Sequence, residues 1–172
     1  MLVAAFAEVV DAEELRLGSI CVGRVPVGRG TPDRYVIVSD GEVRVLRIDV
    51  YSFGPDCFAF EDAVIWQGNV LIGFGSHVHA IDMRDRSSVT IDLGSYYGHV
   101  YPTADYLLIA SGERLFRLAA DRSLVWTSDV LGIDGVVVHE ADVELIRGDG
   151  EWDPPGGWEP FTVSARDGTR LT

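Results

Sequence analysis

Short runs of β-branched and aromatic residues alternate with turns rich in Gly, Asp and Ser along most of the chain. Hydrophobic residues almost nowhere recur with helical spacing. The one segment that fits a helix is a short turn over residues 12–17, where Asp11 is placed to cap the start. This pattern predicts an all-β protein made of short antiparallel strands.

A repeat of about 37 residues organises these strands. Ile72, Ile109 and Ile146 follow one another at intervals of 37 residues, and Ile37 lies 35 residues before Ile72. Three of these isoleucines sit in related segments, which read Asn69-Val-Leu-Ile-Gly-Phe-Gly, Tyr106-Leu-Leu-Ile-Ala-Ser-Gly and Val143-Glu-Leu-Ile-Arg-Gly-Asp-Gly. A second, independent motif repeats at nearly the same interval. Asp85-Arg86-Ser87 occurs again 36 residues later as Asp121-Arg122-Ser123.

Each repeat reads as strand, short turn, strand, Gly turn, strand, Asp turn, strand. Four antiparallel strands in fewer than about 40 residues form the unit of a β-propeller blade. Such a unit has two open edges and two apolar faces, so it is stable only when it packs on neighbours. We therefore expect a small propeller-like fold of about four blades, with an antiparallel sandwich as the alternative.

The predicted organisation is a single all-β domain over residues 1–172, with repeats over residues 18–60, 61–99, 100–135 and 136–172. Only Thr169 to Thr172 follow the Asp167-Gly168 turn of the last repeat. We expect the apolar strand within residues 2–10 to complete that repeat and so to close the ring by pairing the two ends of the chain.

The segment Asp121-Arg-Ser-Leu-Val-Trp126 resembles the turn, outer strand and tryptophan of quinoprotein-like propeller repeats. Residues 60–172 resemble quinoprotein-like and WD40-like blades more generally, and residues 18–60 resemble them poorly. The resemblance implies a fold and no bound group. The Gly-His and Trp-Asp signature of WD40 blades is missing, and the other repeats have no tryptophan matching Trp126, so we expect no quinone and no other cofactor.

Charge narrows the range of partners. The chain has 27 acidic and 14 basic residues, a formal net charge of −13, and every basic residue is arginine. A nucleic acid is not an expected partner because its phosphates would be repelled, whereas a basic protein would be attracted. The absence of lysine excludes a Schiff-base lysine, a phosphate-loop lysine and a Ser-Lys dyad.

The apolar stretches are too short to predict a membrane span, and the N-terminal residues lack the charge polarity of a secretory signal. The sequence thus predicts a cytoplasmic protein with no membrane partner. Cys21 and Cys57 form no CxxC pair and are expected to be free thiols.

His77 and His79 lie two positions apart in a predicted strand, so both imidazoles point to one face. Such a pair can bind one zinc ion if a third ligand joins it, and His99 or His139 is a candidate for that ligand. The alternative is that the pair binds no metal and faces solvent or a neighbouring repeat.

The segment over residues 148–160 is the strongest departure from the repeat. Asp121 and Asp167 are 46 residues apart, against 36 for the preceding equivalents, so this repeat carries an insertion of about ten residues. Tryptophans on loops are typical binding anchors. We predict a binding site made by Glu151, Trp152, Asp153 and Trp158. The alternative is that the two tryptophans fold back and close one end of the core.

No catalytic motif stands out, and no catalytic residue is predicted. The preferred interpretation is a non-enzymatic protein-binding module that engages another protein, in one version a bacterial immunity- or antitoxin-like protein that masks a basic partner. The first alternative is a metal-dependent enzyme that uses His77 and His79. The second is a structural repeat domain that assembles into a homo-oligomer.

Overall fold

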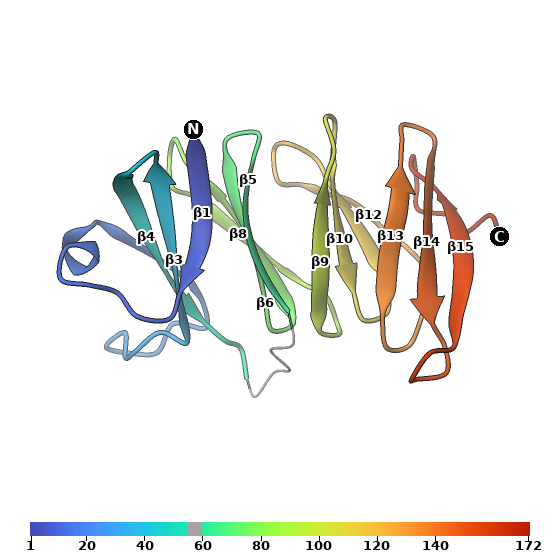
Figure 1. Cartoon of the computed structure of the whole chain (residues 1–172), viewed down its shortest axis with the longest axis horizontal. Coiled ribbons are helices and arrows are strands. Elements are labelled where there is room, and N and C mark those ends of the chain that lie inside the picture. Colours follow the sequence, from blue (N-terminus) through green and yellow to red (C-terminus); the bar gives the residue numbers. More distant parts are fainter. Residues whose placement is uncertain (55–59) are drawn as a thin grey trace. The chain divides into compact units, whose positions relative to one another are not determined.

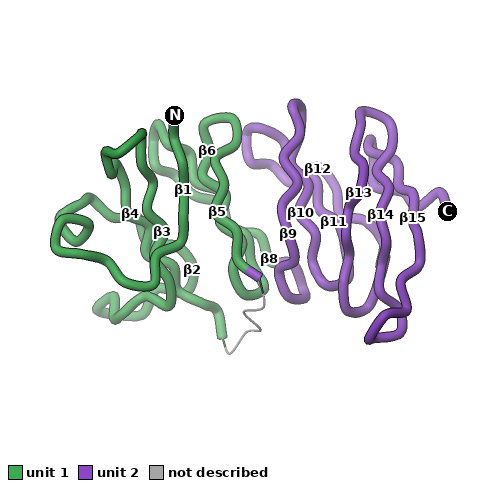
Figure 2. The backbone as a smooth tube through the Cα atoms, viewed as in Figure 1, with its two compact units in different colours: residues 1–57, 61–92 green, residues 58–60, 93–172 purple. Residues whose placement is uncertain are grey.

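A computed structural model describes residues 1–54 and 60–172 of the chain, and Cys57 lies outside these residues. Figure 1 shows that the described residues form β-strands joined by turns, with one short 3-10 helix, η1 (Glu14–Arg16). The all-β prediction is therefore confirmed. The strands fall into two compact units, coloured separately in Figure 2: unit 1 spans residues 1–57 and 61–92, and unit 2 spans residues 58–60 and 93–172.

The first sheet of unit 1 has the order β1-β3-β4-β2. Its strands are β1 (Leu2–Ala7), β2 (Ser19–Gly23), β3 (Arg34–Asp40) and β4 (Val43–Tyr51). All neighbours are antiparallel except β2, which runs parallel to β4. Parallel strands cannot be joined by a tight hairpin, and residues 24–42, which include β3, connect β2 to β4. The predicted helical turn is present as η1, and the Asp11 carboxylate accepts hydrogen bonds from the backbone N–H groups of Glu13 and Glu14.

Strand β1 corrects the expectation of ring closure. It pairs with β3 from Leu2↔Asp40 to Ala7↔Tyr35 and does not join the last repeat, so that prediction is wrong. The physical reason lies in its alternating side chains. Leu2, Ala4 and Phe6 pack against the core of unit 1, while Val3 is 50% exposed.

The second sheet of unit 1 is an antiparallel meander of β5 (Glu61–Trp66), β6 (Asn69–Phe74), β7 (His77–Asp82) and β8 (Ser88–Asp92). The core of unit 1 draws buried aliphatic and aromatic side chains from both of its sheets. These are Ala4, Val22, Val36, Val38, Leu46, Ile48 and Val50 from the first sheet and Val70, Ile72, Phe74 and Ile81 from the second.

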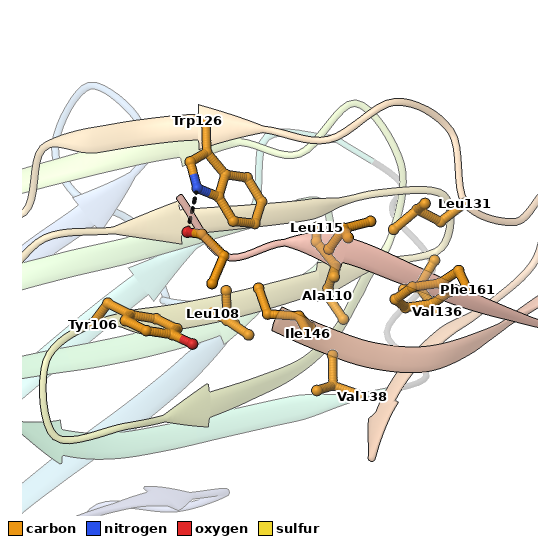
Figure 3. Close-up of a cluster of buried hydrophobic side chains, with 12 residues drawn as sticks. Tyr106, Leu108, Ala110, Leu115, Trp126, Leu131, Val136, Val138, Ile146 and Phe161 are labelled. Atoms are coloured by element: carbon orange, nitrogen blue, oxygen red, sulfur yellow. Dashed lines mark hydrogen bonds between the residues drawn. The ribbon is translucent and has the colours of Figure 1, made fainter. Parts of the chain in front are cut away.

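Unit 2 also contains two sheets. One is a meander of β9 (Tyr97–Pro102), β10 (Leu107–Ser111), β11 (Leu115–Leu118) and β12 (Leu124–Thr127). The other has three strands, β13 (Val136–Ala141), β14 (Leu145–Glu151) and β15 (Trp158–Ser164), and an isolated bridge joins Val163 to Arg170. Figure 3 shows side chains of the two sheets pointing toward one another, among them Leu108 and Leu115 from one and Val138 and Ile146 from the other.

The repeat markers occupy equivalent places. Ile72, Ile109 and Ile146 lie in β6, β10 and β14, one strand in from each sheet's first strand, and all three are fully buried. Four antiparallel-dominated sheets of three or four strands, none closed on itself, fit either a propeller-like or a sandwich arrangement.

The Asp turns also share one geometry. Asp85 accepts hydrogen bonds from the backbone N–H and hydroxyl of Ser87, and Asp121 does the same for Ser123. The residues between them, Arg86 and Arg122, have φ values of 61° and 72°. A third copy follows β15, where Asp167 accepts from the Thr169 N–H and Gly168 takes the left-handed position with φ 73°. The sequence repeat is therefore a structural repeat.

No helix in the part of the chain that the structure describes is long and apolar enough to cross a membrane.

Candidate binding pocket

The segment over residues 148–160 extends a hairpin. Strands β14 and β15 pair without interruption from Leu145↔Ser164 to Glu151↔Trp158. Only the six residues 152–157 form the turn between them. The extra length of this repeat is therefore mostly paired strand, which places Glu151 and Trp158 opposite each other at a rigid hairpin end.

The turn is held by its own hydrogen bonds. The Trp152 N–H donates to the Gly157 carbonyl, and the Gly157 N–H donates to the Asp153 carbonyl. The Gly156 N–H donates to Oε1 of Glu151 at 2.6 Å. A Cβ at Gly157 would lie 2.5 Å from the Cβ of Asp153, so the tight turn requires glycine there.

The loop between β12 and β13 is fastened to the end of this hairpin. The N–H of Ile133 donates to the Glu151 carbonyl at 2.7 Å, and the Glu151 N–H donates to the Gly135 carbonyl at 2.9 Å. At Gly150 a Cβ would lie only 1.7 Å from the carbonyl oxygen of Leu131. The two backbones therefore approach more closely than any side chain would permit. This contact holds the β12–β13 loop against the end of the hairpin.

A pocket of about 190 Å³ lies at this junction within unit 2. We name it the Trp158 pocket. Its walls come from the segment before β5, from strands β9 and β10 with the residue before β9, and from strands β13 to β15 with the loop before β13. The lining residues are Phe60, Tyr96, Gly98, His99, Ser111, Asp134, Gly135, Val136, Val137, Glu151 and Trp158.

Two of the aromatic walls rest on glycines. A Cβ at Gly112 would lie 2.6 Å from the Tyr96 ring, and one at Gly135 would lie 2.8 Å from the Trp158 indole. The Tyr96 hydroxyl also donates a hydrogen bond to the Asp134 carbonyl, which fixes the ring at both ends. Flat aromatic faces are thus held in place before any ligand arrives.

Phe60 completes the aromatic wall. Its ring centroid lies 6.3 Å from that of Tyr96, with planes 27° apart, and 5.1 Å from that of His99. Trp158 is 43% exposed and Phe60 is 41% exposed, so solvent reaches these two rings.

Glu151 is the acidic residue that lines the pocket from β14. The residue is only 9% exposed, and its one hydrogen-bond donor in the described structure is the Gly156 N–H. Within residues 1–54 and 60–172, no arginine or histidine forms an ion pair with it. A buried carboxylate without a cation is costly to maintain.

Comparison with protein-family models and with curated proteins found no match to this chain. The function proposed below therefore rests on the chemistry of the pocket.

Of the four predicted binding residues, Glu151 and Trp158 line the pocket together. Trp152 is half-buried in the turn, and its indole N–H is enclosed without an acceptor among the described residues. Asp153 is exposed and does not line the pocket. Neither tryptophan belongs to the hydrophobic core cluster of unit 2.

Sequence reasoning missed the partners that complete the pocket. Phe60, Tyr96, His99 and Asp134 come from three segments far from β15 in the sequence. Gly112 and Gly135 pack against aromatic rings in the structure. From the sequence alone, such a glycine looks the same as a glycine that a turn requires. Only the sheet-to-sheet packing of unit 2 brings these residues together.

His77 and His79 lie in β7 of unit 1, on the face of Ile81, which belongs to the core. Their ring centroids are 6.5 Å apart, with planes 8° from parallel. Phe53 stacks on His77 at 3.9 Å, and Nδ1 of His79 lies 2.9 Å from Oγ1 of Thr90. Burial, and to a smaller extent the charge of His77, lowers the pKa of His79 to about 4.

The two residues named as a third metal ligand have other neighbours. His99 lines the Trp158 pocket, and Nε2 of His139 lies 2.8 Å from the Asp149 carboxylate. Among the described residues, no group of three or more His, Cys, Asp or Glu side chains is placed to hold a metal ion. The metal site at His77 and His79 stays a hypothesis.

Proposed function

We propose that this chain is a non-enzymatic protein-binding module whose contact surface is the end of the β14–β15 hairpin with the Trp158 pocket. The observation that carries the proposal is Trp158 itself. Trp158 is 43% exposed, yet its indole packs against Gly135, and the buried residue Glu151 lines the same pocket. Leaving such a ring in water costs free energy that contact with a partner would recover.

The composition of the pocket supports a protein partner. Tryptophan and tyrosine are the residues most enriched among interface positions that dominate binding energy. The pocket volume of about 190 Å³ is below the range of roughly 300–1,000 Å³ that encloses a small-molecule ligand. It matches a single inserted side chain. The hydroxyl of Ser111 is engaged in its own turn, where it accepts from the Arg114 N–H at 3.0 Å.

The charge around the hairpin supports a basic partner. Residues 148–165 contain four acidic residues and no basic residue, within a chain of net charge −13. A cationic protein would be steered toward this surface and held there at ordinary ionic strength. An immunity- or antitoxin-like protein that masks a basic partner is the concrete form of the proposal. We also propose that the repeats are propeller-type blades of the quinoprotein-like or WD40-like kind.

The proposal is tested by photo-crosslinking from position 158 in the cells that make the protein. A photoreactive phenylalanine analogue replaces Trp158 in one variant and Val125 in a control. Val125 is a 48%-exposed residue on β12 of the same unit and does not line the pocket. We expect a defined crosslinked product from position 158 that the control does not give. The products of neighbouring genes are the first candidates for its identity.

The captured protein is then purified and its affinity is measured by calorimetry. A Trp158→Ala variant should bind at least about tenfold more weakly, since a dominant interface residue typically contributes about 2 kcal/mol or more. Equal affinity of the variant and the parent would refute the proposed surface. Capture of a second copy of this chain would replace the proposal with the self-assembly alternative.

A further inference from the structure

We propose that the Trp158 pocket receives the side chain of one arginine from the partner, with its guanidinium against the aromatic walls and paired to Glu151. This inference rests on the proposed function and names the group that the pocket recognises. Size, the arrangement of the rings, and charge each support it independently.

The volume limits the occupant to one side chain. A cavity of about 150 Å³ accommodates a benzene molecule, so about 190 Å³ accommodates a guanidinium with the last part of its aliphatic stem. The remaining methylene groups of an arginine would lie along exposed apolar surface, as long cationic side chains commonly do. The exposed rings of Trp158 and Phe60 provide such surface.

The aromatic walls suit a flat cation. A guanidinium stacks on the faces of tryptophan and tyrosine, through both the ring quadrupole and planar contact. Tyr96 and Trp158 are braced by Gly112 and Gly135, so little conformational freedom remains to be lost when a ligand binds. Preorganised rings favour a rigid planar group over a flexible one.

Glu151 supplies the charge that selects a cation. It is 9% exposed and lines the pocket with no ion-pairing partner among the described residues. Its Oε1 accepts one backbone hydrogen bond, from Gly156, and a carboxylate has capacity for several more. An incoming guanidinium would provide the missing countercharge. Exposed Asp134 adds a second acidic residue to the lining.

Glu151 and the flat aromatic rings together distinguish arginine from lysine. A guanidinium presents a planar fork of N–H donors to a carboxylate while its face remains available for stacking. A lysine ammonium is a compact and strongly hydrated charge, which gains less from flat rings. The structure therefore favours arginine over lysine as the occupant.

The test uses the full 172-residue chain, labelled with ¹⁵N, and three hexapeptides that differ at one central position. That position holds arginine, lysine or citrulline, which has nearly the shape of arginine without its charge. Titrations are followed by NMR at pH 8, where an ordinary histidine is neutral. We expect the arginine peptide to shift the Trp158 indole N–H and the Gly135 amide signals in a saturable manner. The citrulline peptide should bind at least about tenfold more weakly than the arginine peptide. The lysine peptide should bind at least about threefold more weakly than the arginine peptide.

Glu151→Gln keeps the shape of the side chain and an oxygen that can accept from the Gly156 N–H. This variant should weaken binding of the arginine peptide by about tenfold or more, because hydrogen bonds between charged groups are the stronger ones. Glu144→Gln is the matched control. It removes the same charge from an exposed residue that does not line the pocket, and it should change the affinity less than about twofold.

Equal binding of the citrulline peptide, or an unchanged affinity in Glu151→Gln, would overturn the inference. Lysine binding as tight as arginine binding would overturn the choice of guanidinium. These failures are separate from failure of the proposed function. If position 158 captures a protein whose binding needs Trp158 but the arginine peptide leaves the pocket signals unmoved, the surface is right and the occupant is wrong.

Discussion

The indole N–H of Trp126 donates a hydrogen bond to the backbone carbonyl of Ala165, 39 residues further along the chain, at 3.1 Å (Figure 3). The same carbonyl accepts from Nη1 of Arg117 at 2.7 Å. Gly168 packs against the Trp126 ring from the turn that follows β15. Trp126 thus joins the β9–β12 sheet to the last turn of the β13–β15 sheet.

This relationship predicts that Gly168→Ala is unusually destabilising. The residue has φ 73°, where any side chain costs about 1 kcal/mol, and its Cβ would lie 2.7 Å from the Trp126 ring. Gly94→Ala is a matched control in the same unit, with φ 71° and no atom within 4 Å of its Cβ. In urea unfolding, Gly168→Ala should lose about 1–3 kcal/mol more than the control. Equal losses would mean that the Trp126 contact contributes nothing.

Tryptophan fluorescence should separate Trp158 from the buried indoles. Trp66 and Trp126 are 7% and 8% exposed, against 43% for Trp158. Acrylamide is the suitable quencher, since iodide would be repelled by a net charge of −13. We expect Trp158→Phe to remove most of the easily quenched emission and Trp126→Phe to leave it in place. If quenching of the Trp158→Phe variant matches that of the parent, the indole is not exposed.

The sequence predicted the repeats because they depend on local rules. Isoleucines 37 residues apart and Asp-x-Ser turns reflect alternation and turn chemistry, which act within a few residues. The structure places all of them at equivalent points. The strand at residues 2–7 was predicted, but its partner was not, because its alternation fits the edge of any sheet. Its choice of β3 depends on long-range packing of Leu2, Ala4 and Phe6.

Two of the four predicted binding residues line the pocket, for the same reason. Glu151 and Trp158 belong to one hairpin and stood out through the extra length of their repeat. Asp153 lies in the turn next to them, but it is exposed and does not line the pocket. Tyr96 and Asp134 arrive from other strands and loops, so only the packing of two sheets against each other reveals them.

His79 should make the protein less stable in acid. Its pKa is about 4 in the folded chain and about 6.5 when unfolded, so the unfolded chain binds the proton more readily. Stability contributed by neutral His79 is therefore complete above pH 6.5, falls as the pH drops below it, and is lost by about pH 4. The full loss is about 3 kcal/mol.

The measurement is urea unfolding between pH 4 and 7, comparing the parent with His79→Asn. The variant should be less stable at pH 7 but should show a smaller fall in stability between pH 6.5 and 4. His139→Asn, at a histidine whose side chain is 55% exposed, should retain the slope of the parent. Parallel pH profiles for the parent and His79→Asn would show that His79 is not responsible.

Chelation should leave the melting temperature unchanged. Phe53 stacks on His77, Thr90 contacts His79, and the described residues provide no three-ligand group, so we expect the fold of unit 1 not to depend on a metal ion. Thermal unfolding with and without a chelator gives the measurement. Stoichiometric zinc that survives gel filtration, and is lost in a His77→Ala/His79→Ala variant, would instead support the metal hypothesis.

Shortening the β14–β15 turn should have little effect on stability. Replacing residues 152–157 with Asn-Gly leaves the Glu151↔Trp158 pair at the end of the hairpin, flanking a two-residue loop that suits antiparallel strands. The change is made in a Glu151→Gln background, because Glu151 would otherwise lose the Gly156 N–H and remain buried with its charge.

Reducing the turn from six residues to two recovers about 1 kcal/mol of loop-closure entropy. The shortened variant should therefore melt within a few degrees of the Glu151→Gln parent, since Trp152 is outside the core cluster of unit 2. If Trp152 instead closes the end of the core, its loss would cost about 3–5 kcal/mol, enough to unfold a marginal domain. Trp152→Ala in the full-length turn distinguishes the causes. A large loss of stability in both variants would assign a structural role to Trp152, whereas a loss confined to the shortened variant would assign it to the new turn.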